Sequence, residues 1–369
     1  MTESAAATTH DGAGGSATGG RRAPTLPKNG VKIVFSDLDG TLVHYEKHFS
    51  PHGRIVTTDA TTAAGGAAAP ATATALYRNE QAGSPRRGET RACALLPTLT
   101  MGPGLFSRRS AELVARLRAE GVIFVYVSGA RKSTMLKRLP LLAPADYAVA
   151  ETGGRMYRLV DDEGGGGGGG GQAPVLDEEW TRDMEALCGS LRDGGPPPEE
   201  RAGALWDWYR ELRARGVPCD ARDYTCCFRV DCTKTPGSDA LVAEALGALP
   251  PGVSCAQNLG KYDFFPATSG KWNAARYLLD ALGLARDDAV ALFDDENDLP
   301  MAEACGHGCV LRCTHARLRE HLPRNPHWHL ATETGVFATE EMLGLLLENA
   351  TSAKRKATPE PNKGKSPAN

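Results

Sequence analysis

The sequence predicts an α/β core with a parallel sheet and an inserted α+β module. Short apolar runs that fit strands buried on both faces alternate with helical patterns near both ends of the chain, which is typical of a parallel sheet covered by helices. Between about 155 and 265 the pattern changes: residues 224–230 alternate as a strand with one covered face, after helical stripes around Trp180 and Trp208. Alternating buried strands and helices resume after this module, so we expect the module to interrupt the core domain.

The elements of the core follow from apolar spacing and from signals at their ends. Residues 33–36 form an apolar strand before an acidic loop, and Ser107 is placed to cap the helix that follows it. Residues 122–127 and 289–293 are two further strands without polar residues. Thr339 is placed to cap a last amphipathic helix.

Segments of low complexity separate these elements. They are rich in Ala, Thr, Gly or Pro, or polar without apolar periodicity, so we expect linkers, loop insertions and tails. They comprise residues 1–29, 58–76, 79–91, 164–171 (a run of glycines), 194–200 and 352–369. The expected organisation is a tail over 1–29, core over 30–154 with an insertion at about 50–95, the module over 155–262, core over 263–350 and a basic tail over 351–369.

Composition excludes several classes of protein. The chain has 369 residues, 41% of them hydrophobic, and a net charge of −3, so nothing favours nucleic acid as a partner. No apolar stretch approaches the roughly 20 residues of a membrane-spanning helix, so we expect no membrane partner. We expect a cytoplasmic protein, with the plastid as the alternative because the first residues are rich in Ala and Thr.

The 10 cysteines include no CxxC pair, and the first residues lack an apolar signal core. Both features argue against a secreted disulfide framework and favour reduced thiols. A metal cluster of Cys305, Cys309 and Cys313 with His307 and His315 is conceivable from the spacing. We prefer the interpretation that these cysteines are small residues lining a buried strand.

The first motif with chemical content is IVFSDLDGTLV, residues 33–43. A strand ends in Asp37 and Asp39, where ligands bind in parallel α/β sheets. Two close carboxylates are costly unless a cation or a proton lies between them. An ordinary Asx turn would explain the isolated motif equally well, so its weight depends on the other motifs.

Two further motifs supply groups for an anion. In VIFVYVSGAR a strand delivers Ser128 and Gly129 into a loop, and Arg131 begins a helix, which suits a phosphate although Ser-Gly turns are common. Lys271 stands at the start of another amphipathic helix, where it can meet a phosphate oxygen as a point charge or be simply solvated.

The fourth motif is ALFDDENDLPM, residues 291–301. A buried strand ends in an acidic cluster that contains Asp294, Asp295 and Asp298. Clustered carboxylates repel one another, and oxygen ligands of this kind suit Mg²⁺. A solvated acidic loop is the alternative, but such loops rarely follow a buried strand directly.

Together and in this order, the motifs resemble those of the haloacid dehalogenase (HAD) superfamily of phosphohydrolases. The resemblance implies a Rossmannoid three-layer core. The module between the second and third motifs is entered by AETGGRMY (150–157) and left by KYDFFPATSGK (261–271). It is similar to the C2-type cap of Cof-type and sucrose-phosphate-phosphatase-like members.

The resemblance also implies roles for individual residues. Asp37 matches the nucleophile that becomes an aspartyl phosphate, and Asp39 matches the general acid/base. Ser128 and Lys271 match the groups that hold the transferring phosphoryl group. The spacing of Asp294 and Asp298 matches the acidic residues of the fourth motif. The implied Mg²⁺ site consists of Asp37, Asp39, Asp294 and Asp298.

Two departures from the family pattern concern the entrance to the site. Phe293 stands where a glycine is usual and could crowd the metal loop, and the insertion at 50–95 could cover the entrance or merely decorate it. In the cap, the substrate could meet Arg229, Lys234 or Lys261, although surface solvation explains each of them as well.

The sequence as a whole predicts a Mg²⁺-dependent hydrolase of a small phosphorylated metabolite. A sugar phosphate is favoured through the resemblance of the cap. A phosphomutase of the same superfamily and, in another class, a binding module that has lost catalysis are the alternatives.

Overall fold

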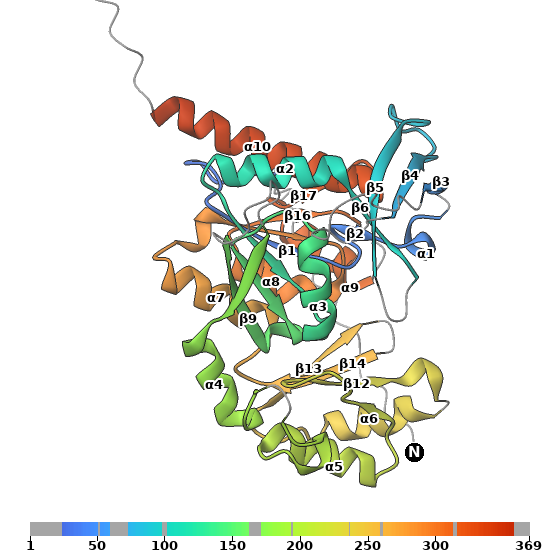
Figure 1. Cartoon of the computed structure of the whole chain (residues 1–369), viewed down its shortest axis with the longest axis vertical. Helices are drawn as coiled ribbons and strands as arrows, with labels where there is room; N and C mark the ends of the chain where they lie inside the picture. The colour runs from blue at the N-terminus through green and yellow to red at the C-terminus, as the bar shows by residue number, and fades with distance from the viewer. Residues whose placement is uncertain are drawn as a thin grey trace, which may run out of the picture.

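The computed structural model describes most of the chain (Figure 1). Of the sequence predictions, those on 1–23, on 60–72, on the glycines 164–170, on Cys313 and His315 and on 358–369 lie outside the described residues. The described residues are 24–50, 52–59, 73–97, 102–161, 171–192, 195–235, 237–258, 261–312 and 316–357.

A large sheet of 8 strands forms the core, in the order β10-β9-β8-β7-β1-β15-β16-β17. Neighbouring strands from β8 to β17 run parallel, whereas β9 and β10 add an antiparallel edge. The predicted α/β class with a parallel sheet is confirmed. The strands are β1 (Ile33–Asp37), β7 (Ile123–Val127), β8 (Tyr147–Ala150), β9 (Arg155–Asp161), β10 (Gln172–Leu176), β15 (Ala289–Phe293), β16 (His307–Val310) and β17 (His329–Leu330).

Helices cover both faces of this sheet, which gives the predicted three layers. Ile33 and Phe35 of β1 pack in one hydrophobic cluster, and Val34 between them packs in the other, as the alternation of a strand requires. The first face is covered by α7 (Lys271–Ala281), α8 (Leu299–Ala304) and α9 (Ala316–His321). The second face is covered by α2 (Arg108–Ala119), α3 (Lys132–Arg138) and α10 (Val336–Ala357).

One of the two predicted helix caps is confirmed. The hydroxyl oxygen of Ser107 accepts hydrogen bonds from the backbone N–H groups of Arg109 and Ser110 at the start of α2. The prediction for Thr339 was wrong, because α10 begins at Val336 and the buried Thr339 hydroxyl donates to the carbonyl of Thr41 at 2.5 Å. The helix also continues to Ala357, into the segment expected to be a tail.

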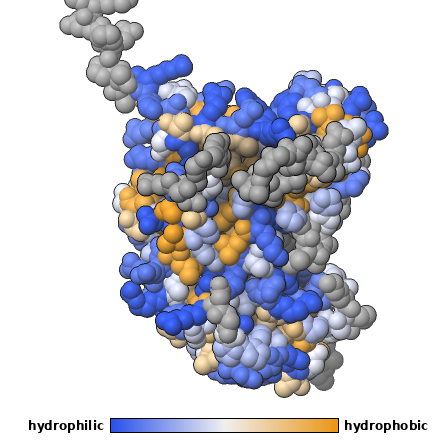
Figure 2. Space-filling model, in the orientation of Figure 1, coloured by the Kyte–Doolittle hydropathy of each residue, from blue (hydrophilic) through white to orange (hydrophobic). Residues whose placement is uncertain are grey.

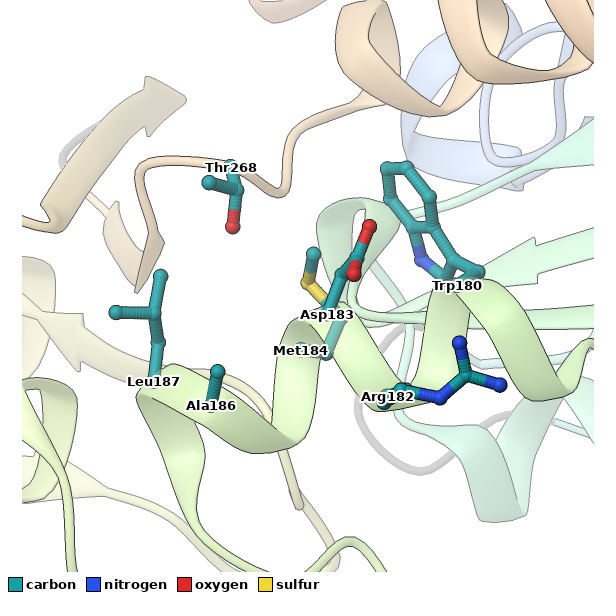
Figure 3. Close-up of a pocket in the computed structure, with 7 residues that line it drawn as sticks. All are labelled: Trp180, Arg182, Asp183, Met184, Ala186, Leu187 and Thr268. Atoms are coloured by element: carbon teal, nitrogen blue, oxygen red, sulfur yellow. The ribbon is translucent and has the colours of Figure 1, made fainter.

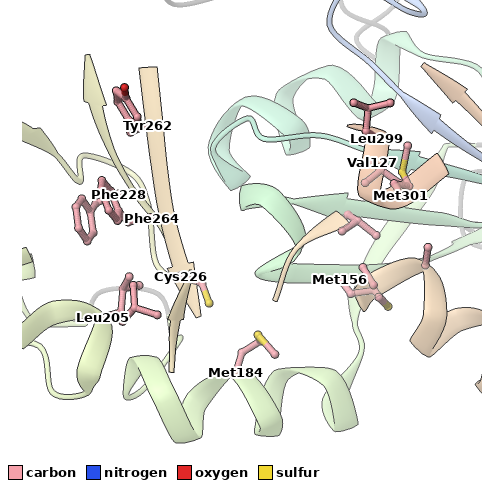
Figure 4. Packing of buried hydrophobic residues seen from close by; sticks show 14 of the residues in the cluster. Val127, Met156, Met184, Leu205, Cys226, Phe228, Tyr262, Phe264, Leu299 and Met301 are labelled. Atoms are coloured by element: carbon pink, nitrogen blue, oxygen red, sulfur yellow. The ribbon is translucent and has the colours of Figure 1, made fainter. Parts of the chain in front are cut away.

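The inserted module is an antiparallel sheet of 4 strands in the order β11-β12-β14-β13, with helices packed on it. Phe228, Phe264 and Leu205 pack inside it, while Met184 and Cys226 lie toward the core (Figure 4). Its elements are α4 (Glu178–Cys188), α5 (Ala204–Ala214), β11 (Cys219–Asp220), β12 (Phe228–Asp231), α6 (Ser238–Leu246), β13 (Val253–Asn258) and β14 (Lys261–Pro266).

The strand pairing shifts both expected boundaries of the module. The expected start at 155 falls on β9, which with β10 extends the core sheet because its apolar residues pack there. The expected end at 262 cuts through β14, which pairs with β12 and β13 over its whole length. The module therefore runs from α4 to the end of β14, and we call these residues, 178–266, the cap.

The insertion at 50–95 is folded where the structure describes it, and its strands include residues 58–59, 74–76, 79 and 90–91 of the segments expected to be loops. It contributes to a second antiparallel sheet of 5 strands in the order β2-β6-β5-β4-β3, beside α10 in Figure 1. Tyr77 and Cys93 are buried in it against Phe337 of α10. The strands are β2 (Val43–His44), β3 (Gly53–Asp59), β4 (Thr74–Asn79), β5 (Thr90–Leu96) and β6 (Gly104–Ser107), with α1 (Glu46–Phe49) between β2 and β3.

Among the described residues, no helix is long and apolar enough to cross a membrane. In the view of Figure 2 the surface of the cap, at the bottom, is mainly hydrophilic. Short 3₁₀ turns join the elements at Leu139–Leu141, Glu151–Gly153, Pro198–Glu200, Cys232–Lys234, Arg286–Asp288, Glu296–Asp298 and Leu322–Arg324.

Candidate active site

The sequence motifs converge at one edge of the core sheet. Strands β7, β1 and β15 are neighbours and parallel, so their carboxyl ends meet there. Asp37 ends β1, Ser128 follows β7 and Asp294 follows β15. Lys271, the first residue of α7, extends into the same place. The fold therefore brings the predicted residues of all motifs together.

A group of 3 carboxylates forms the centre of the site. One ligand oxygen each from Asp37, Asp294 and Asp298 lies within 4.8 Å of the others, and all three residues are buried. The ammonium of Lys271 contacts two of them, with its Nζ 2.5 Å from Asp37 Oδ1 and 2.6 Å from Asp298 Oδ1. One buried cation thus faces a cluster with more negative charge than it can balance.

Burial, together with this surplus of negative charge, shifts the pKa values of the site. Burial, together with the charge of Asp37, raises the pKa of Asp294 from 3.8 to about 7, although Arg312 opposes the rise. Burial also raises the pKa of Asp298 and of Asp37 above the ordinary value, although Lys271 lowers both. Burial lowers the pKa of Lys271, but Asp298 and Asp37 outweigh it, so the net pKa is raised and the lysine stays charged.

The donor set fits a small divalent cation with oxygen ligands. The carboxylates converge, and two further oxygens, Asp298 Oδ2 and Asn297 Oδ1, are buried without a hydrogen-bond partner among the described residues. Mg²⁺ prefers such oxygens in an octahedral arrangement. A cation here would also relieve the repulsion that raises the carboxylate pKa values.

Asp294 is held by residues to which the sequence analysis gave no role. The hydroxyl of Thr41 donates to its Oδ1 at 2.8 Å, and Arg312 Nη2 lies 3.0 Å from its Oδ2. A Cβ on Gly40 would lie 2.3 Å from Asp294 Oδ2, and Gly40 has φ +107°, so only glycine fits. The Gly-Thr pair after Asp39 signalled this support, whereas no pattern marked Arg312.

Asp39 stands apart from the carboxylate group, although it was predicted as a metal-site residue. Its Oδ1 accepts from Nη1 of Arg138 at 2.8 Å and from the hydroxyl of Tyr45. Its Oδ2 lies 3.4 Å from the hydroxyl oxygen of Ser128. Asp39 is paired with Arg138 instead, so among the described residues the carboxylate group that could hold a metal consists of Asp37, Asp294 and Asp298.

The loop of the second motif is polar and tightly packed. Ser128 is buried, and its hydroxyl oxygen accepts from the backbone N–H of Ala130 at 3.0 Å. A Cβ on Gly129 would lie 3.2 Å from the hydroxyl oxygen of Thr152 and 3.5 Å from Asp263 of the cap. The Thr152 hydroxyl is buried without a partner among the described residues. Unsatisfied polar groups beside Ser128 are expected where a polar ligand binds.

The cap contacts this loop and the nearby Glu151 through charged and backbone groups. Arg131 donates to Asp220 at 2.9 Å and to the carbonyl of Arg222 at 2.7 Å. Glu151, buried just before the cap, accepts from the backbone N–H groups of Thr225 and Cys226 at 2.8 and 2.7 Å. These contacts fix the cap over the carboxyl end of the sheet.

The cap residues considered for substrate contact differ in their surroundings. Arg229 forms a bidentate pair with Asp263, at 2.6 and 2.7 Å, and is therefore not simply solvated. Lys261 lies 4.0 Å from Asp231, and the side chain of Lys234 lies outside the described residues. The Arg229–Asp263 pair faces Gly129 and therefore borders the site.

Phe293 is no obstacle at the metal loop. It is the last residue of β15, and its ring packs edge-on against Trp328 in the core, with centroids 5.4 Å apart. The side chain therefore contributes to the core rather than to the acidic loop.

A shallow hollow elsewhere contains none of the predicted site residues (Figure 3). It is lined by Trp180, Arg182, Asp183, Met184, Ala186, Leu187 and Thr268.

Comparison with known proteins agrees with this architecture. Residues 232–323 match the model of the haloacid dehalogenase-like hydrolases. The fold is similar to that of the sucrose-phosphatase from Synechocystis, with a TM-score of 0.50 and 14% identity over 86% of this chain and 98% of that one. A phosphatase of the haloalkanoate superfamily from Bacteroides thetaiotaomicron gives a TM-score of 0.49 and 12% identity, over 86% of this chain and 96% of that one. No curated protein matches the sequence.

Proposed function

We propose a function on the premise that this chain is a haloacid dehalogenase-like hydrolase. It is a Mg²⁺-dependent phosphomonoester hydrolase that acts on a small phosphorylated metabolite through an aspartyl-phosphate intermediate. The observation that carries the proposal is the buried group of Asp37, Asp294 and Asp298 with Lys271 at the carboxyl edge of the sheet. A sugar phosphate is the favoured substrate class, and the likeness to a sucrose-phosphatase supports it.

In the first step, a carboxylate oxygen of Asp37 forms a bond to phosphorus while the bond from phosphorus to the ester oxygen breaks. Asp39 gives its proton to that departing oxygen. Lys271 and Ser128 hold the equatorial oxygens of the phosphoryl group, where negative charge is greatest, and their contacts with Asp37 and Asp39 support this role. The products of this step are the free alcohol and the phosphorylated Asp37.

In the second step, Asp39 takes a proton from a water molecule, whose oxygen attacks the phosphorus of phosphorylated Asp37. The bond between Asp37 and phosphorus breaks, which releases inorganic phosphate and restores both carboxyl groups to their starting states. Mg²⁺ held by Asp37, Asp294 and Asp298 would neutralise phosphate charge in both steps.

The surroundings of Asp37 support its proposed role as nucleophile. Burial raises its pKa, which disfavours the ionised form needed for attack. Lys271 acts in the opposite direction at 2.5 Å, so it supports the ionised form and balances part of the charge brought by a phosphate. Lys271 is therefore proposed both to keep Asp37 ionised and to contact the substrate.

Turnover by the purified protein tests this proposal. We expect release of inorganic phosphate from p-nitrophenyl phosphate and from a subset of phosphorylated sugars in Mg²⁺, and loss of both activities in Asp37→Asn. A matched control is Asp295→Asn, because Asp295 lies in the same acidic loop but outside the carboxylate group and should be dispensable.

The products also separate the proposal from its alternatives. A phosphomutase would convert one sugar phosphate into an isomer without net release of phosphate. A module that only binds would retain phosphorylated sugars without turning over any substrate. Either result would contradict the hydrolase.

A further inference from the structure

A buried arginine connects the acid/base residue with the five-stranded sheet β2-β6-β5-β4-β3. Arg138, at the end of α3, is only 2% exposed, and each of its guanidinium nitrogens donates a hydrogen bond. Nη1 donates to Asp39 Oδ1 at 2.8 Å, Nη2 to the hydroxyl of Tyr45 at 3.0 Å and Nε to the carbonyl of Pro97 at 3.1 Å. Such full use of the fork fixes the plane of the guanidinium.

Tyr45 acts on the same carboxylate oxygen. Its buried hydroxyl accepts from Arg138 and donates to Oδ1 of Asp39. Burial raises the pKa of Tyr45 above its ordinary value, so the hydroxyl keeps the proton that it donates. Oδ1 of Asp39 thus has two donors, while Oδ2 is turned toward Ser128 in the motif loop. Rotating the carboxylate would break both bonds to Oδ1 at once.

We propose that Arg138 and Tyr45 are positioning residues, which hold Oδ1 of Asp39 so that Oδ2 is the oxygen that exchanges a proton with the substrate and with water. This inference rests on the proposed function and deepens it. It follows a general arrangement in which an acid/base group is itself oriented by a third group. In the first step Oδ2 passes its proton to the ester oxygen, and in the second it takes one from the attacking water, while Oδ1 keeps both bonds.

The five-stranded sheet contributes to this arrangement through the residues at the ends of its strands. Pro97, whose carbonyl holds Nε of Arg138, follows directly after β5 of that sheet. Tyr45 lies between β2 of the same sheet and α1. Arg138 comes from the core, on the helix that follows the second motif. Tyr45 and Pro97 flank the insertion at 50–95, so the five-stranded sheet and the residues at its ends supply two of the groups that fix the acid/base residue.

Loss of positioning has a signature that a loss of stability lacks. A poor leaving group needs the proton from Asp39 as it departs, whereas p-nitrophenolate needs little help. General acid–base catalysis is typically worth about 10²- to 10⁴-fold, which sets the upper limit for the effect. We therefore expect Arg138→Met to lower phosphorylation by phenyl phosphate at least about 10-fold more than phosphorylation by p-nitrophenyl phosphate, mainly in kcat rather than KM. Tyr45→Phe should show the same preference with a smaller amplitude.

Matched controls exist in the same core. Arg118→Met removes an arginine paired with Asp146 at 2.8 Å, and Tyr126→Phe removes a buried hydroxyl that donates to a carbonyl at 2.6 Å. Neither residue touches the site, so both controls should treat the two aryl phosphates alike. Arg138→Lys keeps the charge but not the fork, and it should recover only part of the loss.

The decisive experiment is rapid-quench kinetics of phosphorylation with both aryl phosphates in a double-mutant cycle of Arg138→Met and Asp39→Asn. If Arg138 acts through Asp39, its substitution adds no leaving-group effect once Asp39 is asparagine. An equal loss for both substrates, or the same added loss in the Asp39→Asn background, would overturn the inference while leaving the hydrolase intact. Should Arg138→Met not fold, the cycle with Tyr45→Phe gives the same decision. Absence of any turnover in the wild-type protein would overturn the proposed function and this inference with it.

Discussion

Replacing Asp294 by asparagine should stabilise the protein without metal while abolishing its activity. Asp294 is buried beside Asp37 and Asp298, and burial with the charge of Asp37 raises its pKa from 3.8 to about 7. A carboxyl with a higher pKa in the folded than in the unfolded state binds its proton more tightly when folded. Its contribution to stability is therefore complete below about pH 4 and is lost as the pH rises through about 7.

The size of the effect follows from the same residue. Each pH unit between the two pKa values corresponds to about 1.4 kcal/mol, so ionised Asp294 costs on the order of 4 kcal/mol above pH 7. Asparagine avoids the charge and can still accept from Thr41, but it loses the ion pair with Arg312. We expect about half of the full value, a gain of about 2 kcal/mol or roughly 4 °C in Tm.

Thermal unfolding at about pH 8, in EDTA and in Mg²⁺, measures this gain. The variant should melt above the wild type in EDTA, the difference should vanish toward pH 4, and only the wild type should gain stability from Mg²⁺. Asp146→Asn is the control, because Asp146 is paired with Arg118 and accepts from the N–H of Phe124, so its loss should lower Tm under every condition. An Asp294→Asn protein that melts at or below the wild type in EDTA would refute the reasoning.

Three further outcomes are expected. Activity should vanish in EDTA, return with Mg²⁺ and return poorly with Ca²⁺, which takes longer bonds and more ligands; full activity after exhaustive chelation would contradict the metal site. Asp39→Asn should slow sugar phosphates far more than p-nitrophenyl phosphate in rapid-quench phosphorylation, by up to about 10²- to 10⁴-fold, and equal slowing would remove Asp39 as the acid. Shortening the glycine run 164–171 to two residues should change Tm by only about 1–2 °C, because loop closure depends weakly on length, and a failure to fold would show that the run is structured.

The core of the fold could be predicted from the sequence because its signals are local. Strands β1, β7 and β15 are apolar on both faces, and each ends in the polar residues of its motif. Parallel strands bring those ends to one edge, so the meeting of Asp37 with Asp294 and Lys271 follows from chain order and topology together. Ser107 was also predictable, since a helix cap needs only its immediate neighbours.

The five-stranded sheet could not be predicted because it shares its hydrophobic core with α10, which lies far away in the sequence. In β4 only alternate residues are buried, and small Ala and Thr residues weaken the apolar pattern in the sequence. The cluster forms only in the fold, where Tyr77 and Cys93 contact Phe337 of α10. Polar residues of the 79–91 segment are satisfied in the same way, as Asn79 and Ser84 both donate to Glu333. No local pattern contains these partners.

Long-range pairing also explains what the sequence missed in the site. Arginine usually lies at the surface, and nothing in the local sequence sets Arg138 or Arg312 apart. Only the fold places them beside Asp39 and Asp294. The position of the Asp39 side chain outside the carboxylate group could not be predicted for the same reason, because its partner Arg138 lies 99 positions further along the chain.

The central claim is that Asp37 carries the phosphoryl group during turnover. Acid quench of Asp39→Asn with p-nitrophenyl phosphate and Mg²⁺, followed by mass spectrometry of its peptides, tests this most directly, since loss of the base slows removal of the phosphoryl group. We predict one phosphoryl group on the peptide that contains Asp37, and none in the variant that also carries Asp37→Asn. A phosphoryl group on another residue, or steady release of phosphate with no phosphorylated peptide at any time, would contradict the account.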